Sequence, residues 1–141
     1  MLDYQFTEEE KMVRELARKI ALEKVLPVRA ELDEKEEFPW AIMKVFAEAD
    51  LCGLWIPEQY GGFGTSVTAF CLATEEISRI CGGVGVTFAA SALGGTPILL
   101  FGSDEQKQKY LPPLASGAWP PAYWQPGRSG SASAGGARPS A

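Results

Sequence analysis

The sequence contains no histidine. This absence excludes a histidine general base, a Ser-His-Asp triad and any metal site with imidazole ligands. Cysteine is scarce as well: Cys52, Cys71 and Cys81 are odd in number and form no C-x-x-C motif, so neither a disulfide framework nor a zinc site is indicated. We interpret them as small apolar residues buried in a reducing compartment, with a reactive thiol as the alternative.

Positive charge is also limited. The 141 residues carry 13 Lys and Arg against 18 Asp and Glu, which gives a net charge of −5. Nucleic-acid surfaces need clustered basic side chains, so this balance argues against a nucleic-acid partner. No stretch approaches the length of about 20 apolar residues that a membrane span requires. The acidic start of the chain is unlike a signal or transit peptide, and a cytoplasmic location is therefore expected.

Alternating strand patterns of convincing length are absent, and helical spacing is found instead. Thr7 and Glu10 have the spacing of a capping box, and apolar residues then recur at three- and four-residue steps to about Val25. Pro27 is expected to kink or end this helix. The next helix is predicted to open at 38–39.

The predicted buried side of this second helix consists of Trp40, Met43, Val45, Phe46 and Ala49. Gly53 is expected to act as its C-cap. An ordered loop rich in glycine follows, in which positions 61, 62 and 64 are expected to adopt positive φ.

Thr65 or Ser66 can cap a third helix that extends to about Cys81 and is broken by the glycines at 82–83. The following segment, 84–101, has no charged residue, so a helix there is expected to be covered on all sides. Its internal Gly and Pro residues predict two helical pieces, or one helix with a distorted middle.

Ser103 begins a capping box for a last short helix, which Pro112 and Pro113 are expected to stop. The sequence thus predicts an all-α bundle of five or six helices over about residues 4–116. The domain is assigned to residues 1–117, followed by a tail over 118–141.

Two motifs favour structural interpretations. The glycines at 83 and 85 resemble the start of a dinucleotide-binding loop, but the third glycine position is Phe88 and no strand precedes it. The neighbouring acids Glu75 and Glu76 point about 100° apart on a helix, so we interpret them as a solvated face rather than an acid–base pair. The small residues of this segment leave two alternatives open: close packing of a core helix, or the lining of a groove. They are Ala89, Ala90, Ser91, Ala92 and Gly94.

A larger resemblance is carried by the order of several segments. They are F-T-E-E-E, F-P-W, G-L-W-I-P-E-Q-Y-G-G-F-G, A-T-E-E-I-S-R, and G-G-T-P-I-L-L-F-G-S-D-E-Q-K-Q-K-Y-L-P-P-L-A-S-G. Over about residues 2–117 the chain strongly resembles the N-terminal helical domain of the acyl-CoA dehydrogenases.

The resemblance implies an FAD-dependent oxidation of the Cα–Cβ bond of an acyl-CoA thioester, in which a carboxylate removes the α-proton. It also implies electron transfer to an electron-transfer flavoprotein and assembly as a homo-oligomer. The family's catalytic base belongs to a C-terminal domain, so no catalytic, FAD-binding or metal-binding residue is assigned here. By position, the residues on the acyl-pocket wall are Val86, Ala89, Ala90, Leu93 and Gly94. Ala89 is small and predicts a moderately deep pocket.

The last segment departs from the family. From Ala118 onward, 18 of 24 residues are Ala, Gly, Pro or Ser, and the Thr-Glu-Pro and Gly-Ser-Asp motifs expected there are missing. A frameshift, a truncation and a natural low-complexity tail are the three explanations, and disorder is expected in each case.

Three functional readings follow. In the first, the chain is an acyl-CoA dehydrogenase domain that is inactive alone, with weak or absent FAD binding. In the second, it is a non-catalytic helical module that associates with full-length subunits. In the third, it is the product of a damaged gene.

Overall fold

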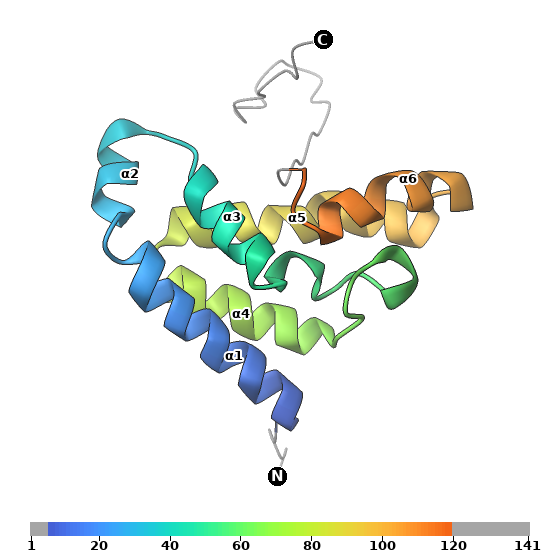
Figure 1. Cartoon of the computed structure of the whole chain (residues 1–141), viewed down its shortest axis with the longest axis horizontal. Coiled ribbons are helices and arrows are strands. Elements are labelled where there is room, and N and C mark those ends of the chain that lie inside the picture. The colour runs from blue at the N-terminus through green and yellow to red at the C-terminus, as the bar shows by residue number, and fades with distance from the viewer. Residues whose placement is uncertain (1–5, 120–141) are drawn as a thin grey trace.

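The computed structural model describes residues 6–119, which form helices and turns (Figure 1). Within this range there is no strand, so the predicted all-α class is confirmed. The α-helices are α1 (Glu8–Ile20), α2 (Arg29–Lys35), α3 (Trp40–Glu48), α4 (Val67–Ile80), α5 (Gly82–Phe101) and α6 (Asp104–Ala115). Three short helical turns complete the set: η1 (Ala21–Val25), η2 (Leu51–Gly53) and η3 (Glu58–Tyr60).

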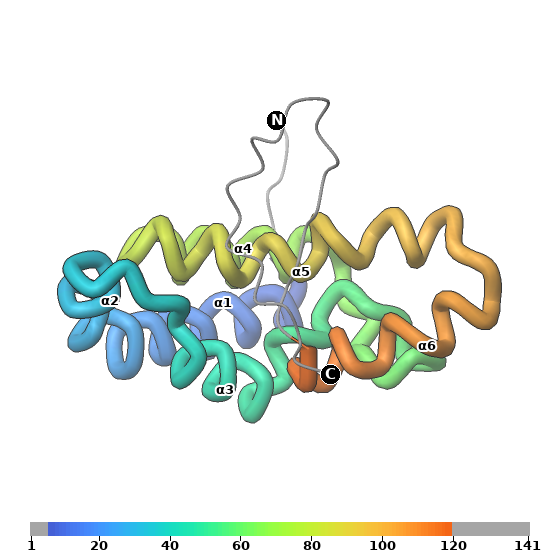
Figure 2. Tube along the Cα trace, turned by 90° about the horizontal axis from the view of Figure 1, so that it is seen from above, coloured from blue at the N-terminus to red at the C-terminus, as the bar shows by residue number. Residues whose placement is uncertain are grey.

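The helices form two layers. Figure 2 shows α4 and α5 in one layer, and α1, α2, α3 and α6 in the other. The helix α5 runs along the longest dimension of the molecule, and α6 turns back beneath its second half (Figures 1 and 2). In the second view none of the helices between residues 6 and 119 covers the side of α5 that faces away from α6, and the candidate site lies on this side.

Side-chain caps fix the starts of three helices as the sequence predicts. The Thr7 hydroxyl accepts a hydrogen bond from the Glu10 amide at 3.2 Å, while the Glu10 carboxylate accepts from the Thr7 amide at 2.9 Å. Ser66 caps α4, and Ser103 begins a complete capping box on α6. Because each cap satisfies amides that have no partner inside the helix, these boundaries are encoded locally.

Other predicted boundaries and faces are corrected. The helix α3 ends at Glu48 rather than at Gly53, because Asp50 takes the left-handed conformation with φ 60°. Trp40 is 56% exposed instead of buried, since the core-facing positions of α3 are 42, 43 and 46. The helix α6 continues through Pro112 and Pro113 to Ala115, where its last turn packs into the core.

The core is divided between two clusters. In the larger one, buried residues of α1, α3, α4 and α5 pack together. The ring of Phe88, from α5, is stacked on that of Phe70 at 5.0 Å and meets that of Phe46 edge-on at 5.4 Å. The smaller one joins the loop after α3 to α6 through Ile56, Tyr60 and other buried residues. Burial of these side chains is what holds the two layers together.

The loop between α3 and α4 is ordered, as predicted, but its glycines serve two purposes. Gly61 and Gly64 have φ of 81° and 59°, which favours glycine. Gly62 does not adopt positive φ as expected. Its backbone lies so close to Ile56 that an added Cβ would sit 2.6 Å from the Ile56 carbonyl carbon.

Candidate functional site

The helix α5 is one continuous helix from Gly82 to Phe101, although it contains Pro97 and several glycines. Of the two predicted alternatives, a division into two helical pieces near 94–97 is therefore wrong. Its inner face uses glycine to approach its neighbours: an added Cβ at Gly85 would lie 2.9 Å from the Ser78 Cα, and one at Gly95 would enter the ring of Trp55. These close approaches hold α5 against α4 and against the loop between α3 and α4, which carries Trp55.

We define the outer face of α5 as an apolar stripe along one side of the helix. Its positions are Val86, Ala89, Ala90, Leu93, Gly94, Pro97, Leu100 and Phe101. At about 100° per residue, its positions fall within an arc of about 140°, opposite the buried residues. Val86 is 70% exposed and Leu93 is 56% exposed, whereas Ala89, Ala90 and Gly94 are half-buried between them. The stripe continues through Pro97 to Leu100 and Phe101.

The structure therefore brings together on one side of α5 the five positions that the family resemblance implies for an acyl-pocket wall. The expectation that this segment is covered on all sides is wrong for the described part of the chain, because large apolar residues are exposed there. Contiguous apolar surface of this kind is typical of a binding groove or an interface. Of the two alternatives left open, close packing applies to the inner face and an exposed lining to the outer face.

By length and composition alone, α5 could cross a membrane. This corrects the expectation that no stretch reaches that length, although such a criterion is also met by core helices. The contacts of α5 with α4 and α6 place it as a member of the bundle.

A charged cluster joins α1 to α4, and the sequence analysis missed it. Glu76 is 3% exposed, so its assignment to a solvated face is wrong, while that of Glu75 is correct. Arg18 donates two hydrogen bonds to the Glu76 carboxylate, at 2.8 and 2.9 Å, and Arg14 donates a third at 2.8 Å. The spacing of the two arginines, one helical turn apart, was the signal available in the sequence.

These hydrogen bonds, led by those from Arg18, lower the pKa of Glu76 to about 2. A carboxylate with such a low pKa is a weak base and is already satisfied by guanidinium donors. We therefore assign it a structural role.

The cysteines differ in their surroundings. Only Cys52 is fully buried, and burial raises the pKa of its thiol to about 11. Cys71 is exposed on α4 and Cys81 is half-buried, so the expectation of three buried cysteines holds for one of them. The residues described here contain no cluster of His, Cys, Asp and Glu that could hold a metal ion.

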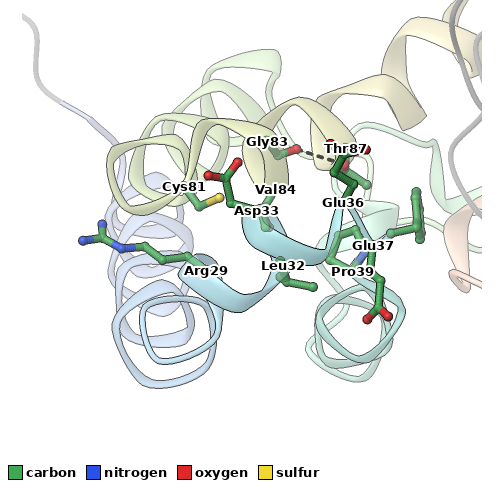
Figure 3. Close-up of a pocket in the computed structure, with 11 residues that line it drawn as sticks. Arg29, Leu32, Asp33, Glu36, Glu37, Pro39, Cys81, Gly83, Val84 and Thr87 are labelled. Atoms are coloured by element: carbon green, nitrogen blue, oxygen red, sulfur yellow. Dashed lines mark hydrogen bonds between the residues drawn. The ribbon is translucent and has the colours of Figure 1, made fainter.

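A hollow of about 520 Å³ lies between α2 and the start of α5 (Figure 3). Its lining includes Asp33, Glu36 and Glu37, and its single basic residue, Arg29, donates to the carbonyl of Ile80 at 2.8 Å. The negative charges of these three carboxylates would repel the pyrophosphate of FAD. The glycines at 83 and 85 lie on α5, where 85 is packed against α4. Neither this hollow nor the glycines at 83 and 85 therefore provide a site for the pyrophosphate of FAD.

Residues 7–118 match the family model described as "Acyl-CoA dehydrogenase, N-terminal domain". The probable acyl-CoA dehydrogenase YngJ of Bacillus subtilis is 39% identical over 117 residues, which is 82% of this chain and 31% of that protein. The chain thus spans about a third of the length of this relative.

Solved structures show the same family similarity. A chain from the structure described as "Electron transferring flavoprotein of Acidaminococcus fermentans" is 38% identical, with a TM-score of 0.78, over 82% of this chain and 31% of its own. Acyl-CoA dehydrogenase from Bacillus anthracis, complexed with FAD, is 37% identical, with a TM-score of 0.76, over 84% of this chain and 21% of its own. The helical bundle is that of an acyl-CoA dehydrogenase N-terminal domain. The chain belongs to the acyl-CoA dehydrogenase family.

The tail assigned to 118–141 lies outside the described residues except at its start. There Trp119 donates its amide to the carbonyl of Pro113 at 3.1 Å, and its ring lies 6.0 Å from that of Tyr110. The division between domain and tail and the three explanations for the tail stay predictions.

Proposed function

We propose that residues 7–118 form one wall of the acyl-binding site of an acyl-CoA dehydrogenase, with the outer face of α5 against the acyl chain. The observation that carries the proposal is the exposure of Val86 and Leu93 on a helix without a charged residue, beside the small residues Ala89, Ala90 and Gly94. Small residues leave room for a substrate, and the large ones at either side provide apolar contact.

The chemistry of this surface suits a hydrocarbon chain. Burying a methylene group contributes about 0.8 kcal/mol, without any directional requirement, so an acyl chain needs apolar lining rather than donors or acceptors. The outer face of α5 offers apolar side chains over four turns. A side chain larger than Ala89 would fill part of this space.

We further propose that this chain alone does not dehydrogenate acyl-CoA. Its one buried carboxylate, among the residues described, is held by Arg18 and Arg14 at the interface of α1 and α4. A base needs access to the substrate proton, and Glu76 has none. FAD binding and the base are accordingly assigned to parts of a complete enzyme that correspond to none of the described residues.

By extension from the family, an acyl-CoA is the proposed substrate of the complete enzyme, and an electron-transfer flavoprotein its electron-accepting partner. A homo-oligomer is the proposed assembly. The likeness to a chain from the Acidaminococcus flavoprotein structure supports the partner.

A chimera tests the proposed wall. Residues 7–118 replace the corresponding segment of the Bacillus anthracis enzyme, with that parent enzyme and the 141-residue chain as controls. The chimera is expected to bind FAD stoichiometrically and to oxidise an acyl-CoA, while the chain alone does neither. A folded, fully flavin-loaded chimera that oxidises no acyl-CoA from short to long chains would contradict the proposal.

The second candidate is a non-catalytic module that associates with full-length subunits. The exposed outer face of α5 favours it, because large exposed apolar surfaces often mark interaction sites. Mixing the tagged chain with an untagged complete homologue distinguishes the two. Co-purification of the homologue in a fixed ratio supports the module, whereas its absence at high protein concentration argues against it.

A further inference from the structure

The corner between α2 and α3 presents two neighbouring aromatic side chains to solvent. Phe38 is 39% exposed and Trp40 is 56% exposed, and their ring centroids are 4.5 Å apart. Tryptophan is a residue type that often dominates binding at protein interfaces. An exposed aromatic pair is therefore the feature of this corner that needs explanation.

Two hollows flank this pair. The hollow of about 520 Å³ described above lies toward α5, and a second one of about 330 Å³ lies between α2 and the start of α3. They share Leu32, Glu37, Phe38 and Pro39, so the two hollows adjoin at the link between α2 and α3. Trp40 lines only the second of them. The second hollow is mainly apolar, with Val28, Ala41 and Ile42 among its lining residues.

Carboxylates surround both hollows. Asp33, Glu36 and Glu37 line the first, and Glu37 also lines the second. Within residues 6–119 none of these three has an ion-pair partner, whereas Glu31, which also lines the second hollow, is bonded to Lys35 at 2.5 Å. Figure 3 shows Arg29 extending away from Glu36 and Glu37, toward the opposite side of the hollow.

We propose that this corner docks a basic segment of a partner protein. The aliphatic part of an arginine or lysine side chain lies in an apolar hollow, as long basic side chains do elsewhere. Its charged end lies over the ring of Trp40 and against the carboxylate of Glu37, and Glu36 adds negative charge from the adjoining hollow. The negative charge selects a basic partner over an acidic or neutral one. The inference goes beyond the proposed function, because it uses no residue of the outer face of α5.

The direct test compares two peptides with the 141-residue chain by calorimetry at low ionic strength. One is an acetylated, amidated tetra-arginine; the other replaces each arginine with citrulline, which keeps the shape and removes the charge. The arginine peptide is expected to bind at least about tenfold more tightly, and its binding to weaken as salt is added. Equal binding of the two peptides would overturn the proposal, as would no binding at about 1 mM arginine peptide.

Variants locate the site. Trp40→Ala is expected to weaken arginine-peptide binding about two- to fivefold, because the ring face is lost. The pair Glu36→Gln and Glu37→Gln is expected to weaken it at least about fivefold. The control pair, Glu23→Gln and Glu58→Gln, changes net charge equally at exposed positions elsewhere. An equal loss in the control pair would show that net charge alone attracts the peptide, and would overturn the assignment. Circular dichroism checks that each variant is folded.

Discussion

Arg18 and Glu76, 58 positions apart in the sequence, form a two-point contact between α1 and α4 in which both carboxylate oxygens accept from one guanidinium. The planar donor pair matches the planar acceptor pair, which gives this contact directional specificity. Glu76 is buried, whereas Arg18 is about half-exposed and can be hydrated. Loss of the contact would therefore cost the carboxylate more than the arginines. The contact fixes the relative position of two helices in different layers.

Replacing Glu76 with Gln is expected to destabilise the domain by about 2 kcal/mol. The substitution leaves an uncharged amide facing Arg14 and Arg18, but these arginines can turn toward solvent, which limits the loss. Urea unfolding followed by circular dichroism measures the change. Glu75→Gln on the same helix is the control and is expected to stay within about 0.5 kcal/mol of the wild type. Equal effects of the two substitutions would contradict the structural role of Glu76.

The same contact predicts a pH dependence. Folding lowers the pKa of Glu76 from its ordinary 4.5 to about 2, so the ionised form is favoured in the folded state. Its contribution is therefore fully present above about pH 4.5 and is lost as the pH falls toward 2. The difference in unfolding free energy between wild type and Glu76→Gln is expected to shrink from pH 6 to about pH 3. A difference that stays constant over this range would argue against the ion pair.

Gly95→Ala is expected to destabilise the domain by about 1–3 kcal/mol. The added Cβ would enter the Trp55 ring, with the Cζ2 atom at 2.8 Å, so the helix or the loop must shift. Gly83→Ala, on the same helix, has no heavy atom within 4 Å of its new Cβ. It is expected to be neutral or stabilising by up to about 0.5 kcal/mol. Thermal and urea unfolding of both variants measure the contrast, and equal destabilisation would contradict the close approach.

Thiol reactivity should separate the cysteines. Cys71 is exposed and is expected to react first with a disulfide reagent at pH 8. Burial raises the pKa of Cys52 from 9.0 to about 11, so its thiolate fraction is about 100-fold lower, and access is blocked as well. Cys52→Ser is expected to remove the slowest phase of labelling. Loss of a fast phase in that variant would show that Cys52 is accessible.

Local signals made much of the fold predictable. The hydroxyls of Thr7, Ser66 and Ser103 start three helices, and each pattern is contained within four residues. The order of the glycine-rich loop and the positive φ of Gly61 and Gly64 were also predictable. Glycine is required at position 62 for a different reason, because its backbone approaches Ile56 closely across the turn. Such approaches depend on tertiary packing and leave no pattern in neighbouring residues.

The errors arise where distant residues meet. Glu76 is satisfied by arginines about 60 positions away, so the local rule for neighbouring acids could not predict its burial. Trp40 is apolar but lies at the start of α3, out of phase with the core-facing positions. For α5, the absence of charge predicted complete burial. Its inner face does pack closely, through glycines and the buried Phe88, but the large residues of its outer face are exposed. The positions of the candidate wall came from the family resemblance, and their placement on one side of α5 came from the structure.

The outer face of α5 is the proposed acyl-chain wall, and Ala89→Phe in the chimera tests this role most directly. The measurement is kcat/KM over a series of saturated acyl-CoAs, with Thr68→Phe on the exposed face of α4 as the matched control. With Phe at position 89, the ratio of long-chain to short-chain kcat/KM is expected to fall at least about tenfold at unchanged flavin content, because the ring fills space beside the chain. The control is expected to leave the ratio unchanged. An unaltered chain-length profile in a flavin-loaded Ala89→Phe chimera would contradict the central claim.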